Sequence, residues 1–207
     1  MQGTGKRLVI ATGSRHKFGE LSELLDLPST ELLSLADLNL PDSAVENGQT
    51  FEANARIKAL HYSALAGLPT LADDSGLEVD ALGGRPGVYT RRYAGPEATD
   101  EQNNAKLLAE LEGFYGPDER TARYRCVLLL LDEDGTQEVT TGTLEGRIAA
   151  SARGAGGFGY DPIFEPLTEP ASGRTVGEMS ASEKNAISHR AHAARAMRDR
   201  LLGRGYK

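Results

Sequence analysis

The chain has 207 residues, of which 39% are hydrophobic, and its formal net charge is −7. This length suffices for one large domain or for two closely packed lobes. The acidic balance argues against a general binder of nucleic-acid polymers, because such proteins usually carry a basic excess. A single cysteine, Cys126, excludes an internal disulfide framework, and no apolar run approaches the ~20 residues of a membrane span. Because residues 1–13 have no long apolar core, we expect no signal peptide and a cytoplasmic protein without membrane association.

The first elements in chain order predict an α/β fold. Residues 7–12 form a short apolar, β-branched run that is typical of a buried strand, and helical spacing predicts a helix that ends before Pro28. A second strand is expected near Leu32–Leu35, and a helix over 50–67 with a glycine as its stop signal. A short strand would then deliver Asp73 and Asp74 to its carboxyl end, where α/β sheets bind ligands.

The remaining elements continue this pattern. Thr99 and Gln102 form a capping box that predicts a helix to about Glu112. Residues 121–149 indicate two strands joined at Asp134-Gly135, a hairpin signal. A second capping box predicts a last helical region from residue 180 to about 202, with a break near 188–190. No clean linker interrupts the chain, so we expect one domain, 1–207, with two lobes that share a cleft.

A candidate anion site lies at IATGSRHK, residues 10–17. Free backbone N–H groups and the positive end of a helix favour anions at such a strand–helix junction, and Lys17 adds a full charge. The pattern is not a Walker A loop, which needs GxxxxGK[ST]. An ordinary turn with an exposed lysine is the alternative.

A polar stripe marks the helix predicted over 50–67. Asn54, Lys58 and His61 follow at i, i+4 and i+7 and therefore lie on one face, beside an apolar stripe. Glu46 lies just upstream. A solvated helix face is the alternative interpretation.

Adjacent carboxylates at Asp73 and Asp74 repel each other and are costly to bury, so they need a partner. Consecutive strand residues point to opposite sides, and the two acids therefore need not share one role. One is suited to bind Mg²⁺, and the other to accept a proton or to anchor the turn. A turn with two solvent-exposed aspartates is the alternative.

Two further segments carry groups suited to a nucleobase. In GGFGYDPIF, residues 156–164, Phe158 offers a stacking face and Asp161 an acceptor, although a structural loop with a phenylalanine in the core is the alternative. On the last helical region, Lys184 and Ser188 share a face whose donors suit carbonyl oxygens of a base. A basic surface helix is the alternative there, and the spacing of the histidines does not indicate a zinc site.

Together, five blocks in this order give the chain a specific resemblance: ATGSRHK, TFEANARIKA, LADDSGLEVDALGGRPGVYTRRYAG, GFGYDPIF and EKNAISHR. Over roughly residues 7–203 it resembles the noncanonical purine nucleoside triphosphate pyrophosphatases, the inosine triphosphate pyrophosphatase family. The resemblance implies an α/β fold with a long central mixed sheet flanked by helices, two lobes around a substrate cleft, and a homodimer. It also implies Mg²⁺-dependent hydrolysis of ITP, dITP and XTP to the monophosphate and pyrophosphate.

The resemblance assigns roles to the matching residues. The triphosphate would be held by Thr12, Gly13, Ser14, Arg15, His16 and Lys17. Mg²⁺ would be bound by Glu46 and Asp74, with Asp74 also the proton acceptor and Asp73 and Lys58 supporting that centre. The rest of the substrate would be contacted by Ser75, Phe158, Gly159, Tyr160, Asp161, Lys184, His189 and Arg190, the last three lining the base pocket. The family often has asparagine where this chain has Ser14, which leaves the role of that position open.

Two alternatives to this function remain at the level of the sequence. One is a nucleotide sensor without catalysis, and the other is a pyrophosphatase for modified pyrimidine nucleotides. The acids Glu46, Asp73 and Asp74 favour catalysis, because a pure binder of a polyanion has no need for them. The block EKNAISHR argues against pyrimidine substrates. How guanine would be excluded is left open, since it also carries a 6-oxo group.

Overall fold

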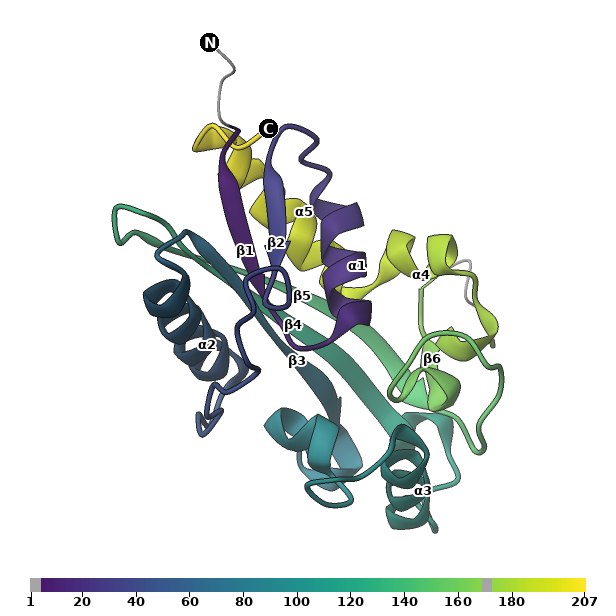
Figure 1. Ribbon diagram of the computed structural model, residues 1–207. Coiled ribbons are helices and arrows are strands. Elements are labelled where there is room, and N and C mark those ends of the chain that lie inside the picture. The colour runs from purple at the N-terminus through teal and green to yellow at the C-terminus, as the bar shows by residue number, and fades with distance from the viewer. Residues whose placement is uncertain (1–4, 169–172) are drawn as a thin grey trace. The chain divides into compact units, whose positions relative to one another are not determined.

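The computed structural model describes residues 5–168 and 173–207. Six strands form one mixed sheet in the order β2-β1-β3-β4-β5-β6 (Figure 1). The strands are β1 (Arg7–Ala11), β2 (Glu31–Ser34), β3 (Thr70–Val79), β4 (Thr121–Leu131), β5 (Gln137–Ile148) and β6 (Phe164–Pro166). β1 pairs in parallel with β2 and with β3, and β5 pairs antiparallel with β6. The predicted α/β fold with a mixed central sheet is therefore confirmed.

The helices also match the predicted positions. They are α1 (Arg15–Leu25), α2 (Phe51–Ala66), α3 (Asp100–Glu110), α4 (Ala181–Ile187) and α5 (His189–Gly203). Both capping boxes form, at Thr99 with Gln102 and at Ser180 with Glu183. Gly67 ends α2 in the left-handed conformation, which a residue without Cβ adopts at no steric cost. Short 3₁₀ turns occupy Asp80–Leu82, Gly87–Arg92, Pro117–Arg120, Asp161–Ile163 and Val176–Glu178.

One local prediction is wrong: Asp73 and Asp74 do not end a short strand. They lie in the middle of β3, which continues to Val79. Both are buried, at 1% and 8% exposure, so the alternative of two solvent-exposed aspartates in a turn is also wrong. Pairing with β1 nevertheless stops just before them, because the last paired residues are Ala11 and Ala72. The loop that follows β1 therefore starts beside the two aspartates.

The chain divides into two compact units. The first unit consists of Met1–Asp74, Cys126–Gly142 and Arg190–Lys207, and the second unit of Ser75–Arg125 and Thr143–His189. The chain passes from one unit to the other within β3, β4 and β5 and after the first residue of α5. The predicted cleft and the treatment of 1–207 as one domain stay predictions.

In the first unit, helices cover both faces of the strands (Figure 1). Alternate residues of β1, Leu8 and Ile10, are buried with side chains of α1 and α5, which include Leu21 and Met197. The buried stripe of α2, which includes Ala55 and Ala59, covers the other face. This packing fixes α1 and α2 on opposite sides of β1 and β3.

The second unit has its own core. Strand residues such as Leu77, Tyr124 and Leu144 pack with Leu107 of α3 and with Phe164 of β6. None of the helices in the described part of the chain is both long and apolar enough to cross a bilayer.

Candidate active site

The junction between β1 and α1 forms the expected strand–turn–helix site. Ser14 is the N-cap of α1, and its hydroxyl accepts a hydrogen bond from the Lys17 backbone N–H at 3.4 Å. The Thr12 hydroxyl accepts one from the Ser14 N–H at 3.2 Å. Serine and asparagine both cap helices well, so Ser14 fits this position through its capping role. The junction opens on a groove of about 430 Å³ lined by residues of the first unit, among them Thr12–Arg15, Phe18 and Asp42.

Gly13 sits where no side chain fits. A Cβ built on it would lie 2.0 Å from Asp42 Oδ2. Close approach of the Asp42 carboxylate therefore requires glycine at this point of the junction.

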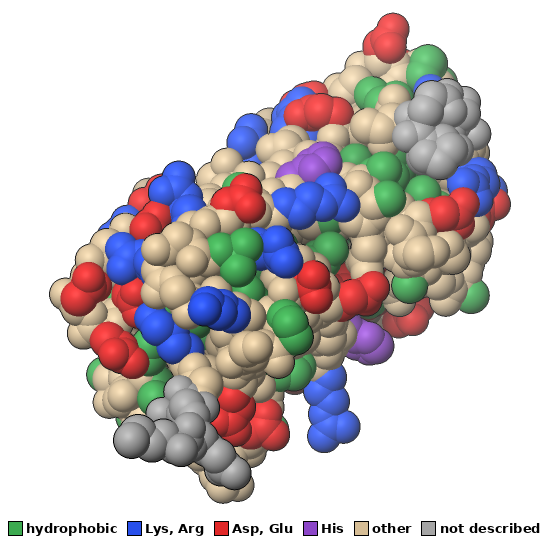
Figure 2. Space-filling model, turned by 90° about the horizontal axis from the view of Figure 1, so that it is seen from above, with side chains coloured by type: hydrophobic (Ala, Val, Ile, Leu, Met, Phe, Trp, Pro, Cys, Tyr) green, Lys and Arg blue, Asp and Glu red, His purple; other side chains and the backbone are tan. Residues whose placement is uncertain are grey.

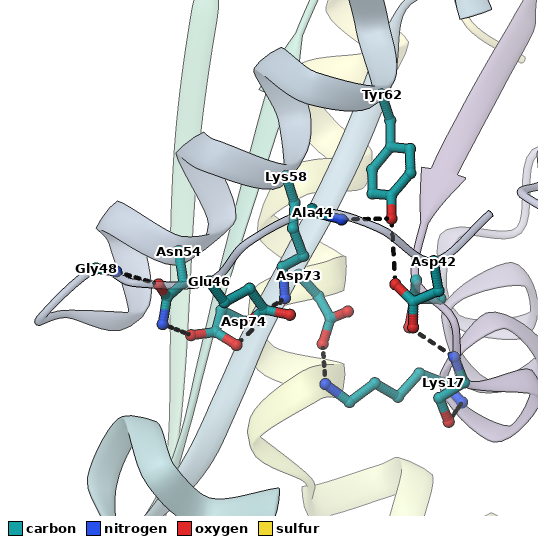
Figure 3. A network of polar contacts seen from close by, with 12 residues as sticks. Lys17, Asp42, Ala44, Glu46, Gly48, Asn54, Lys58, Tyr62, Asp73 and Asp74 are labelled. Carbon is teal, nitrogen blue, oxygen red and sulfur yellow. Dashed lines mark hydrogen bonds and ion pairs between the residues drawn. The ribbon is translucent and has the colours of Figure 1, made fainter. Parts of the chain in front are cut away.

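Lys17 and Asp73 form a direct ion pair. Lys17 Nζ donates to Asp73 Oδ2 at 2.8 Å, and the Asp73 side chain is 1% exposed (Figure 3). Burial alone would raise the pKa of Asp73, but the positive charges of Lys17, Lys58 and Arg190 outweigh it and hold that pKa well below its usual range. Asp73 is thus ionised at neutral pH, and its carboxylate fixes the Lys17 ammonium.

Asp74 meets a different environment. Lys58 Nζ lies 3.3 Å from Asp74 Oδ1 and 3.0 Å from Glu46 Oε2, so two carboxylates converge on one ammonium (Figure 3). Burial raises the pKa of Asp74 above the usual aspartate range, and the nearby acids Glu46 and Asp73 add to the rise although Lys58 and Lys17 oppose it. Burial would lower the pKa of Lys58, but the surrounding acids outweigh it and raise that pKa. Neighbouring aspartates therefore differ in basicity, as separate roles require.

Asn54 and Lys58 of the polar stripe of α2 are buried and face the two acids, so this part of the stripe is not a solvated face. Asn54 is 1% exposed, and its Nδ2 donates to Asp74 Oδ2 at 3.1 Å. Lys58 is buried between the two acids, and His61 Nε2 lies 3.1 Å from the Ser43 hydroxyl. The helical spacing correctly predicts that these three side chains act on one side of α2.

In the second unit, Asp161 organises the glycine-rich loop. Its Oδ2 accepts from the Phe158 N–H and from Lys184 Nζ, both at 2.9 Å, and its Oδ1 accepts from the Tyr124 hydroxyl at 3.2 Å. Gly157 has φ +74°, and a Cβ there would lie 2.1 Å from Asp161 Oδ2. The loop can therefore fold around this carboxylate only with glycine at that position.

Phe158 and His189 both have charged or aromatic neighbours in the second unit. Lys184 Nζ lies 4.3 Å from the centroid of the Phe158 ring, within cation–π range. Phe158 is half-buried, so the alternative in which it plugs the core is wrong. The ring of Tyr124 stacks on His189 at 4.7 Å with an interplanar angle of 11°.

Tyr124 is a candidate site residue that the sequence does not reveal, since nothing in the strand pattern of β4 distinguishes it from other core tyrosines. It contacts two predicted site residues, Asp161 and His189. Tyr160, by contrast, lies in the core at 2% exposure, and its hydroxyl donates to the Thr90 carbonyl at 2.9 Å. Its contact with substrate stays a prediction.

The predicted site residues fall in both units. Arg190 belongs to the first unit, is 2% exposed and pairs with Glu20 of α1. The first unit also holds Thr12–Lys17, Glu46, Lys58, Asp73 and Asp74, whereas the second holds Ser75, Phe158–Asp161, Lys184 and His189. Arg15 and His16 are exposed, and Ser75 is half-buried. The substrate contacts of these residues stay predictions.

A family model described as the Ham1 family matches residues 8–200. This chain belongs to the Ham1 family. A relative from Thioalkalivibrio sulfidiphilus (strain HL-EbGR7), named dITP/XTP pyrophosphatase, is 48% identical over 200 residues, which cover 96% of this chain and 100% of the relative. A relative of the same name from Erwinia tasmaniensis is 49% identical over 201 residues, which cover 96% of this chain and 95% of the relative. A solved Ham1 protein from Coxiella burnetii is 40% identical and has a TM-score of 0.85. The match covers 96% of this chain and 99% of the Coxiella chain.

Ham1-family membership confirms the resemblance deduced from the five sequence blocks. The match at residues 8–200 spans every block, from the β1–α1 junction to the start of α5. The carboxylate centre, which consists of Glu46, Asp73 and Asp74 with Lys58, lies inside the matched region, and so does the loop around Asp161.

Proposed function

We propose that this protein hydrolyses noncanonical purine nucleoside triphosphates, namely ITP, dITP and XTP, to the monophosphate and pyrophosphate. The observation that carries the proposal is the unequal pair in β3. Asp73 is neutralised by Lys17 at 2.8 Å, whereas the neighbouring Asp74 has a raised pKa and is suited to accept a proton. The names of the relatives, dITP/XTP pyrophosphatase, support this class of substrate and favour catalysis over a nucleotide sensor or a pyrimidine-specific enzyme.

The carboxylate centre fits Mg²⁺. Among residues 5–168 and 173–207, no group of three or more His, Cys, Asp and Glu side chains is arranged as a metal site. Mg²⁺ is usually held by only one or two carboxylates, together with waters and substrate phosphates. Glu46 and Asp74, which converge on the Lys58 ammonium, provide such a pair. When bound there, Mg²⁺ would neutralise phosphate charge next to the reacting phosphorus.

The residues of the chain divide the remaining work. Lys17 and the N-terminus of α1 attract the triphosphate, whose charge they partly neutralise. Asp73 holds the Lys17 ammonium in place. Asp74 accepts the proton of a water that attacks the α-phosphorus in line, and pyrophosphate leaves on the opposite side. Lys58 stabilises the negative charge on both carboxylates and on the reacting phosphate.

Recognition of the base belongs to the loop around Asp161. Phe158 offers a half-buried aromatic face whose orientation is fixed through Asp161 and Lys184. Donors near the base would pair with the 6-oxo oxygen of hypoxanthine or xanthine. Adenine carries a 6-amino group and would leave those donors unpaired, which costs about 1–3 kcal/mol for each.

The charge distribution agrees with a small anionic substrate. On the face drawn in Figure 2, Lys and Arg side chains are interspersed with Asp and Glu rather than gathered in a continuous basic band. A nucleic-acid polymer would need such a band. The homodimer and the cytoplasmic location remain predictions.

A panel of nucleotides tests the proposed function. ITP, dITP, XTP, GTP, ATP and dTTP would be incubated with the protein, with Mg²⁺ or with a chelator, and pyrophosphate and orthophosphate measured separately. We expect pyrophosphate from ITP, dITP and XTP only, and only with Mg²⁺. Release of orthophosphate alone would exclude attack at the α-phosphorus, and equal turnover of dTTP would exclude purine selectivity.

A further inference from the structure

The segment 42–48, which carries Glu46, runs antiparallel to α2 and is held by it at successive helical turns (Figure 3). Near its start, the Tyr62 hydroxyl accepts from the backbone N–H groups of Ser43 and Ala44 at 3.0 and 3.3 Å. In the middle, Lys58 Nζ contacts Glu46 at 3.0 Å. At the end, the Gly48 N–H donates to Asn54 Oδ1 at 2.8 Å.

Asn54 differs from the other two anchors because it joins the backbone of the segment to Asp74 of β3. Its Oδ1 accepts from Gly48, and its Nδ2 donates to Asp74 Oδ2 at 3.1 Å. A backbone N–H can only donate and an ionised carboxylate can only accept, so the orientation of the amide is determined by its neighbours. Only an amide side chain provides an acceptor and a donor in this fixed arrangement.

The contact at Gly48 leaves no room for adjustment. A Cβ built on Gly48 would lie 2.7 Å from Asn54 Oδ1 and 2.8 Å from Ala53 Cβ. The backbone of the segment is therefore pressed against the start of α2 two residues after Glu46. Any shift of Asn54 changes the path of the segment that carries Glu46.

The same amide restricts Asp74. Asp74 Oδ2 accepts from Asn54 and Oδ1 accepts from Lys58, so both oxygens are oriented and rotation of the carboxylate is blocked. One buried side chain therefore contacts both the segment of Glu46 and the carboxylate of Asp74.

We propose that Asn54 is a positioning residue that couples the Glu46 segment to Asp74 and so fixes the spacing of the two carboxylates. The significance of that spacing for a divalent cation rests on the proposed function. Partners that orient metal-binding carboxylates typically change metal affinity or activity by about 10–100-fold when they are lost.

Asn54→Leu removes both hydrogen bonds and keeps the branched shape of the side chain with a somewhat larger volume. Asn103→Leu, which makes the same change, is its matched control. Asn103 is also buried on a helix, accepts from the Ala94 N–H at 2.8 Å and donates to the Arg91 carbonyl at 3.0 Å. Both variants should lose similar stability. Only Asn54→Leu should weaken the binding of Mn²⁺ to the substrate-free protein, by ~10-fold or more as measured by calorimetry. Only this variant should also lower kcat for ITP, and by a larger factor than it changes KM. Equal effects of the two variants on Mn²⁺ binding and kcat would overturn the proposal.

Gly48→Ala tests the same coupling by changing the segment 42–48 instead of Asn54. It provides a test even if Asn54→Leu does not fold. The added methyl group must push the segment away from the amide. We expect the same pattern, a weaker Mn²⁺ affinity and a lower kcat, with a smaller loss of stability than for Asn54→Leu. Native Mn²⁺ affinity and kcat in this variant would contradict the coupling.

A readout without metal or substrate separates this proposal from the proposed function. Hydrogen exchange of the Gly48 amide, followed by NMR on glycine-labelled protein, should accelerate in Asp74→Ala, because Asn54 then loses the acceptor that orients it. Unchanged exchange would mean that Asp74 and the segment are independent, whatever the activity. Failure of the wild-type protein to release pyrophosphate from ITP would instead remove the proposed function and leave this coupling standing.

Discussion

Lys17 Nζ lies 2.8 Å from Asp73 Oδ2, although the two residues are 56 positions apart in the chain. The pair joins the first turn of α1 to the middle of β3, at the point where Ala11 and Ala72 make the last contact between β1 and β3. Asp73 is buried at 1% exposure, while the Lys17 side chain is 20% exposed. The surrounding positive charges lower the pKa of Asp73, whereas burial raises the pKa of Asp74, so Asp74 has the higher proton affinity of the two.

Asp73→Asn should lower the free energy of unfolding by about 3 kcal/mol at pH 7, because it breaks a buried ion pair. The pKa of Asp73 is depressed in the folded state, so its stabilisation is present above the unfolded pKa of about 4 and is lost as the pH falls toward the folded value. Urea unfolding of both proteins at several pH values would measure this. The difference in free energy of unfolding between the wild type and Asp73→Asn should become smaller below about pH 4. A difference that stays constant or grows there would contradict an ionised Asp73 in the folded protein.

Asp74→Asn should reduce kcat for ITP by about 10²–10⁴-fold, because the proton acceptor is lost. Stability should change by only about 1 kcal/mol, since burial already disfavours the charged form of this residue. Steady-state kinetics and urea unfolding on the same preparation would check both expectations. Near-normal turnover would remove Asp74 from the reaction.

The acid limb of the pH–rate profile should have its midpoint above the pKa of an ordinary aspartate. Burial, Glu46 and Asp73 raise the pKa of Asp74, and the reaction needs its ionised form, so the rate must fall as the pH falls through that raised pKa. The dependence of kcat/KM for ITP on pH, which reports the groups of the free enzyme, would show it. A rate that stays flat down to about pH 4 would be incompatible with this acceptor.

Phe158→Ala should raise KM for ITP by about 5–150-fold with a smaller change in kcat, because stacking on a base contributes about 1–3 kcal/mol. Phe158→Tyr keeps the aromatic face and serves as the matched control, with KM close to that of the wild type. Initial rates over a range of ITP concentrations would separate the two parameters. An equal KM for the alanine and tyrosine variants would exclude stacking.

Arg120→Leu should destabilise the protein by about 2–4 kcal/mol, since it leaves buried acceptors without a donor. The Arg120 guanidinium donates to the backbone carbonyls of Leu111, Phe114, Ile148 and Ala149 at 2.8–3.1 Å. Arg125→Leu removes only an exposed ion pair with Glu78 and should cost less than about 1 kcal/mol. Thermal unfolding of both variants would compare their stabilities. A similar loss of stability in the two variants would mean that the four hydrogen bonds of Arg120 to backbone carbonyls contribute little to the fold.

The sequence alone determined the elements and the chemical groups of this protein. Apolar periodicity, capping boxes and glycine stops are local signals, because they depend on residues within a few positions of one another. They predicted α2 from Thr50 to Gly67, the hairpin at Asp134-Gly135 and the break at Ser188. The family resemblance predicted the acids and lysines of the candidate site, although not which oxygen meets which nitrogen.

Only the tertiary structure decided which partners and which environment each of these groups has. The length of β3 depends on neighbouring strands, so local signals ended it too early, at the aspartates. The difference between Asp73 and Asp74 arises from burial and from charges contributed by α1, α2 and α5, which are distant in sequence. The contacts of Asn54 and Tyr124 arise in the same way, because their hydrogen-bond partners, Gly48, Asp74 and Asp161, become neighbours only when the chain packs.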